Sequence, residues 1–189
     1  MRKITAIDRI LLLTTGLLAA YQVAVGIEGL PALPTLCYTI AFGVLLISGL
    51  LLIIFGFEIL DSQAVVVVAA IIPLSLSLGL VVEHLPSLQN GYLAFAALGF
   101  LAIALTRWLA VGKPATITLA TVHGIAGLLI FGLPLALSLT GRAPLQFGLV
   151  GLGGASSGWV GCCWLSCERE GRSCRPRPSM PFCHGCYCS

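Results

Sequence analysis

Long apolar stretches constrain the fold of this chain more than any other feature. An α-helix rises about 1.5 Å per residue, so about 20 apolar residues cross the hydrocarbon core of a bilayer. Backbone polar groups in hydrocarbon must bond within their own segment, which favours helices here over strands. Five stretches are regular and a sixth, the last, is less so; the predicted spans run over Ile10–Gly26, Leu36–Phe57, Ala64–Val82, Tyr92–Val111, Ile117–Thr140 and Leu145–Leu165.

Composition supports a membrane protein rather than a water-soluble one. Charged residues make up 9% of the chain, which is too few to form the polar shell of a soluble protein. Hydrophobic residues make up 58%, which is more than such a shell could cover. The loops between the spans are short and contain Pro, Gly or charges, so neighbouring helices must be antiparallel. We therefore predict an all-α, polytopic transmembrane helical bundle over residues 1–165, followed by a tail over residues 166–189 that is rich in Cys, Arg and Pro.

The positions of the basic residues predict the orientation of the bundle. Cytoplasmic loops carry an excess of Lys and Arg. With six spans and a cytoplasmic N-terminus, the outer side holds Arg142 alone, and both termini are cytoplasmic. The inner side then holds the other nine of the ten Lys and Arg residues, namely Arg2, Lys3, Arg9, Arg107, Lys113, Arg169, Arg172, Arg175 and Arg177. This pattern predicts a multi-pass protein of the prokaryotic inner membrane. The net charge of +3 is too small to indicate a nucleic-acid partner.

One ionisable side chain lies within a predicted span and is the first candidate for function. His123 is six residues into the fifth span, about 9 Å from the inner surface. Glu58 and Asp61 lie where the second span reaches the same surface. A carboxylate and an imidazole so placed could relay a proton, and intramembrane ionisable groups often mark such pathways. The competing interpretation is a histidine that is hydrogen-bonded inside a packed bundle.

Haem binding and catalysis are both disfavoured. The second histidine of the bundle, His84, is predicted with Glu83 in a loop at the opposite surface, about 20 Å from His123 in depth, so one haem cannot bridge the pair. The sequence GASSG at 154–158 resembles a nucleophile elbow in spacing only, because that motif needs a preceding strand. No nucleophile, base and acid converge, so an enzyme is the least favoured class.

A short internal similarity links the third and fifth spans. PLSLSLG at 73–79 and PLALSLTG at 134–141 each contain a proline that frees a backbone carbonyl. Paired broken helices can mark a transporter site. Chance similarity is the alternative, in which Ser75, Ser77 and Ser138 bond to their own helix or to a neighbour. Two tyrosines near span ends, Tyr38 and Tyr92, are expected at the membrane interface.

Residues 162–189, which include the tail and the end of the sixth predicted span, contain seven of the eight cysteines, and this region permits three interpretations. Its spacing resembles a two-knuckle zinc site. The candidate zinc ligands are Cys167, Cys174, Cys183, His184, Cys186 and Cys188. A naturally disordered tail is the second interpretation. The third is a shifted reading frame from about residue 154, because leucine codons read one base late become cysteine codons. The frame shift also explains why Leu, Ile and Val almost vanish from that point.

These observations leave three hypotheses for function. The first is a non-catalytic membrane protein that contacts the lipid bilayer and other membrane proteins, or copies of itself, within a larger complex. The second is a small transporter or proton-coupled carrier that uses His123 with Glu58 or Asp61. The third is a zinc-binding membrane protein that acts through its tail.

Overall fold

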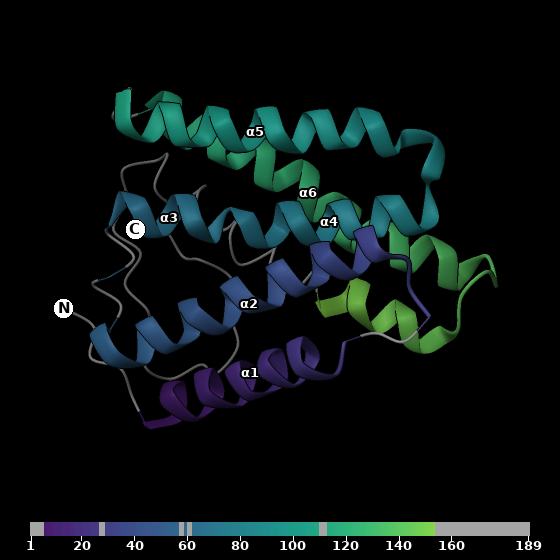
Figure 1. Ribbon diagram of the computed structural model, residues 1–189, viewed down its shortest axis with the longest axis horizontal. Coiled ribbons are helices and arrows are strands. Elements are labelled where there is room, and N and C mark those ends of the chain that lie inside the picture. Colours follow the sequence, from purple (N-terminus) through teal and green to yellow (C-terminus); the bar gives the residue numbers. More distant parts are fainter. Residues whose placement is uncertain (1–5, 27–28, 57–58, 60–61, 110–112, 154–189) are drawn as a thin grey trace, which may run out of the picture. The chain divides into compact units, whose positions relative to one another are not determined.

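A computed structural model describes residues 6–26, 29–56, 59, 62–109 and 113–153 (Figure 1). Every regular element in these ranges is a helix, which confirms the predicted all-α class. Five helical segments are long and apolar enough to cross a membrane. The elements are α1 (Ala6–Val25), α2 (Ala32–Phe55), α3 (Gln63–Ala69), α4 (Ile71–His84), the short 3₁₀ helix η2 (Pro86–Leu88), α5 (Gln89–Leu109) and α6 (Lys113–Leu139).

The predicted sixth span is only partly covered by these ranges. Residues 145–153 are helical, and Leu145 follows the helix end at Leu139 after a short turn. Residues 154–165, which would complete the span, lie outside the described residues. The predicted boundary between the bundle and the tail lies outside them as well, so both stay predictions.

The chain divides into two compact units within α6, Met1–Leu133 and Pro134–Ser189. In the first unit, helices that follow one another along the chain pack side by side. Helix α1 packs on α2, α2 on α4, and α4 on α5, as Figure 1 shows. This order follows from the short loops, because a short connection keeps two consecutive helices next to each other.

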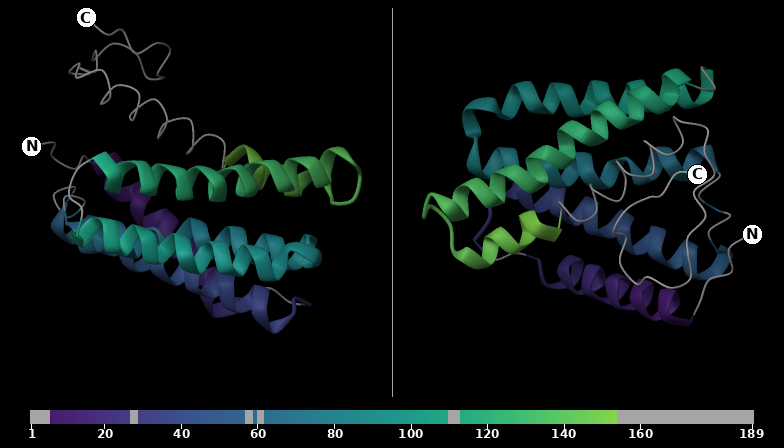
Figure 2. Two further views of the ribbon diagram at one scale, coloured as in Figure 1. Left: turned by 90° about the horizontal axis from the view of Figure 1, so that it is seen from above. Right: turned by 180° about the vertical axis from the view of Figure 1, so that it is seen from behind.

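The core of the first unit is formed where α3, α4, α5 and α6 meet. Figure 2 shows α6 crossing these helices rather than continuing their row. Small residues permit the close approach, because a Cβ atom added at Gly99 of α5 would lie 3.1 Å from Cγ1 of Val122 on α6. The buried residues of this cluster are Val67, Ala70, Leu74, Ala96, Ile103, Val122 and Ala126.

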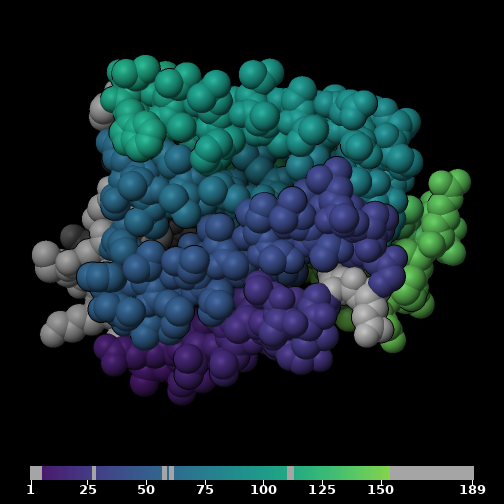
Figure 3. All heavy atoms as spheres, in the orientation of Figure 1, coloured from purple at the N-terminus to yellow at the C-terminus, as the bar shows by residue number. Residues whose placement is uncertain are grey.

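Helix α1 lies at the edge of the first unit. Gly16 and Ala19 are its buried residues, and it packs on α2 (Figure 3). Gly16 faces α2, where an added Cβ atom would lie 3.6 Å from Cδ1 of Leu46. The large apolar side chains of α1 other than Leu12 are exposed, which in a membrane means that they face lipid or another protein.

The predicted third span is a helix that restarts in the middle. It covers α3 and α4, which are separated by Ala70. Pro73, the third residue of α4, has no N–H to donate to the carbonyl of Ala69, and proline is tolerated in the first turn of a helix but not in its interior. Pro134, by contrast, lies inside α6, which continues through it to Leu139.

Candidate functional site

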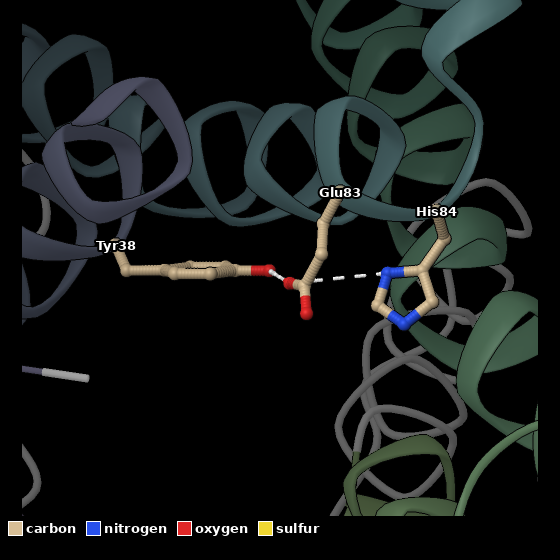
Figure 4. A network of polar contacts seen from close by, with 3 residues as sticks. All are labelled: Tyr38, Glu83 and His84. Carbon is tan, nitrogen blue, oxygen red and sulfur yellow. Dashed lines mark hydrogen bonds and ion pairs between the residues drawn. The ribbon is translucent and has the colours of Figure 1, made fainter. Parts of the chain in front are cut away.

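A polar contact between α2 and α4 is the most distinctive feature of the first unit (Figure 4). The Tyr38 hydroxyl donates a hydrogen bond of 2.9 Å to Oε2 of Glu83, across 45 residues of sequence. Nδ1 of His84 lies 3.8 Å from the same oxygen. The Glu83 side chain is 30% exposed and that of His84 18%, so the carboxylate is partly screened from solvent. We call Tyr38, Glu83 and His84 the α2–α4 clasp.

The path of the Tyr38 side chain explains how the clasp is built. Tyr38 is 7% exposed, and its ring lies on Gly79, four residues before Glu83 on the same face of α4. A Cβ atom at Gly79 would come within 2.6 Å of Cε1 of Tyr38. Glycine therefore provides the space through which the ring reaches the carboxylate.

A second polar contact joins α4 to α5. Ser77 is fully buried, and its hydroxyl donates to the carbonyl of Pro73 at 2.6 Å. The Tyr92 hydroxyl donates to Oγ of Ser77 at 2.7 Å, and the Tyr92 ring packs on Phe95 with 5.4 Å between ring centroids. Ser77 thus bonds both to its own helix and to a neighbour, as one interpretation of the internal similarity predicted. Helix α4 is held by one polar contact on each side.

The second serine of the internal similarity, Ser138, lies in the second unit. It is 8% exposed, and Oγ donates to the carbonyl of Pro144 at 3.3 Å. A Cβ atom at Gly148, in the helical segment 145–153, would lie 3.2 Å from Oγ of Ser138. Ser77 and Ser138 are the buried polar side chains of the described residues, so both halves of the similarity use a serine to contact the helix that follows.

His123 lies farther from the start of its helix than the hydropathy pattern predicted. Because α6 begins at Lys113, His123 is ten residues into the helix, about 15 Å from its start rather than 9 Å. Its Nδ1 atom is buried and has no hydrogen-bond partner in the described part of the chain. Glu58 and Asp61, the predicted partners, lie outside the described residues, so their proximity to His123 is not tested.

Some of the remaining predicted site residues lie in the described ranges and others lie outside them. Glu83 and His84 form the last turn of α4 rather than a loop. Measured by helix rise from the starts of the spans Gln63–His84 and Lys113–Leu139, His84 and His123 differ in height by about 16 Å. A haem shared by the two histidines therefore stays disfavoured. The six candidate zinc ligands lie outside the described ranges. Within those ranges, no three His, Cys, Asp or Glu side chains gather as a metal site.

Sequence reasoning missed the α2–α4 clasp because it assigned each member a separate role. Tyr38 was expected at the membrane interface, but it is buried, and Glu83 with His84 was expected in a loop. One signal was present, since Gly79 and Glu83 are four residues apart and therefore share a face of a helix. That pattern could have identified a carboxylate beside a close helix contact, but not its partner on α2.

Comparison with protein-family models, with curated proteins and with solved structures finds no match to the chain.

Proposed function

We propose that this chain is a non-catalytic, multi-pass protein of the inner membrane that acts as a subunit of a larger membrane assembly. The observation that carries the proposal is the position of α1, a membrane-length helix with two buried residues that packs on α2 at the edge of the first unit. Lipid provides no hydrophobic force between helices, so a span is held by packing and by polar contacts. Because α1 buries two residues, Gly16 and Ala19, a partner helix on its exposed face would stabilise it.

The same proposal includes an orientation. Both termini lie in the cytoplasm, because that arrangement places nine of the ten Lys and Arg residues on the cytoplasmic side. The α4–α5 connection, with Glu83 and His84 beside it, then lies on the outer side. The partners are other membrane proteins or further copies of this chain, together with the surrounding lipid.

Native mass spectrometry after extraction in a mild detergent tests the assembly. We expect the wild type to form a species larger than one chain. The variant Leu18→Trp should dissociate this species to single chains, because it adds bulk to the exposed face of α1. Leu98→Trp is the matched control, since Leu18 is 63% exposed and Leu98, on α5, is 66% exposed. A wild-type protein that is monomeric before any harsh extraction would refute the proposal.

A proton-coupled carrier is the second candidate function, and one observation favours it. His123 is an ionisable side chain within α6 and its Nδ1 atom is buried, and ionisable groups within spans often line a transport pathway. In reconstituted vesicles, His123→Ala should then abolish pH-dependent transport, while Thr121→Ala should leave it intact. Loss of the folded protein in His123→Ala would instead favour a packing role.

A further inference from the structure

We propose that Glu83 is a proton-binding site and that the α2–α4 clasp is a pH-sensitive contact, closed when Glu83 is ionised and released when it is protonated. A hydrogen bond from a hydroxyl to a carboxylate is charge-assisted and about twice as strong as a bond between neutral groups. Protonation of Glu83 removes that assistance from the 2.9 Å contact with Tyr38. The proton is the ligand, and Glu83 is its acceptor.

The surroundings of Glu83 make the Tyr38 hydroxyl its principal stabilising donor. Glu83 lies in the last turn of α4, where the helix dipole does not favour negative charge. The titratable groups on α2 near this contact are Tyr38 and the buried thiol of Cys37, and α5 contributes Tyr92. Neither α3 nor η2 has a titratable side chain, and His84 is the remaining one on α4.

His84 acts on the same carboxylate. A charged imidazole 3.8 Å from Oε2 attracts the carboxylate and competes with Tyr38 for it. A proton on Glu83 removes the charge-assisted bond itself. Protonation of either group therefore weakens the contact between α2 and α4.

The contact on the other side of α4 does not respond to acidification. Ser77 does not titrate, and a tyrosine such as Tyr92 ordinarily ionises near pH 10. Acidification therefore loosens α2 from α4 while α4 stays bonded to α5 through the 2.7 Å contact between Tyr92 and Ser77. The restart of the helix at Ala70 lies between the clasp and the cytoplasmic end of this span in the proposed orientation, and it offers a point at which α4 could pivot.

Hydrogen exchange of the full chain in phosphatidylcholine nanodiscs tests this proposal. We expect the amides of residues 35–40 and 80–85 to exchange about tenfold faster at about pH 4 than at about pH 7.5, after correction for intrinsic exchange rates. Glu83→Gln and Tyr38→Phe should exchange fast at both pH values, because neither can form the charge-assisted bond. Phenylalanine retains the ring on Gly79, so Tyr38→Phe keeps the packing of the fold.

Two further variants separate this contact from general acid destabilisation. Tyr92→Phe removes a buried hydroxyl of α5 and should retain the pH response of the wild type. His84→Gln should retain the response at the lower pH, because the proton on Glu83 causes it. Equal exchange in the wild type at both pH values would overturn the proposal. A pH response that persists in Glu83→Gln, or that is lost in His84→Gln alone, would also overturn it.

Discussion

At the scale of single residues, Gly79 determines whether α2 and α4 can approach as they do. The Tyr38 ring occupies the position that a side chain at residue 79 would need, and its hydroxyl is bonded at the far end to Glu83. The ring therefore packs on Gly79 along its edge and is bonded to Glu83 at its hydroxyl. A glycine that looks like ordinary helix packing in the sequence is required here by an aromatic ring from 41 residues earlier in the chain.

Gly79→Ala should consequently destabilise the bundle by about 1–3 kcal/mol, the usual range for overpacking a close contact. Gly91→Ala is the matched control, because Gly91 lies near the start of α5 and an added Cβ atom there meets nothing within 4 Å. Thermal unfolding in detergent should show a lower midpoint for Gly79→Ala than for the wild type, and an unchanged midpoint for Gly91→Ala. Equal midpoints for the two variants would mean that the ring moves aside without cost.

At the scale of elements, two prolines in membrane-spanning helices have different effects. Pro73 lies in the first turn of α4, where the missing N–H leaves the helix to restart after Ala70. Pro134 lies inside α6, which continues through it as one helix. The sequences that follow the two prolines are similar, but those that precede them differ, with a run of valines before Pro73 and Gly-Leu-rich sequence before Pro134.

Pro73→Ala should join α3 and α4 into one continuous helix, because alanine supplies the N–H that the carbonyl of Ala69 lacks. Amides of residues 71–75 should then exchange more slowly with deuterium than in the wild type. Pro34→Ala is the control, because residue 34 lies in the first turn of α2, where an added N–H has no carbonyl partner. No change in exchange at 71–75 would show that the break has another cause.

Helix boundaries are a second lesson at this scale. The predicted spans marked the hydrocarbon part of each helix, whereas α1 and α6 begin four residues earlier, at Ala6 and Lys113. A helix keeps its backbone hydrogen bonds as it passes into the interface, so polar and charged residues extend it beyond its apolar stretch. For His123 this difference adds about 6 Å to the distance from the start of its helix.

At the scale of the whole molecule, the proposed orientation predicts the side on which each loop is accessible. A cysteine introduced as Ser87→Cys, in η2, should react with a membrane-impermeant thiol reagent in intact cells. The endogenous cysteines provide the comparison, because Cys37 is buried and the tail would be cytoplasmic. Labelling of residue 87 only after the cells are permeabilised would reverse the orientation.

The tail admits a separate prediction about composition. We expect the purified protein to contain no stoichiometric zinc, because a shifted frame explains the loss of leucine, the gain of cysteine and the Arg-Pro sequence together. Elemental analysis measures this directly, and resequencing of the DNA around codon 154 tests the frame. About one zinc per chain that is lost in the double variant Cys183→Ser and Cys186→Ser would contradict the expectation.

The sequence by itself determined the solvent, the class and the order of the helices. Composition required lipid, the length of each apolar stretch required a spanning helix, and short loops required antiparallel neighbours. These properties depend on totals and on local periodicity, which no distant contact can change. The five spans found by length and hydropathy in the described residues follow the predicted order for that reason.

Only the tertiary structure decided which polar residues meet. The partner of Glu83 is a tyrosine on another helix, and the contact depends on the rotation of α2 and α4 about their axes and on a glycine between them. Hydropathy does not encode that rotation, because the apolar residues of a membrane helix surround it on all sides. In lipid the rotation is instead set by close packing and polar contacts between helices, which exist only once the helices are together.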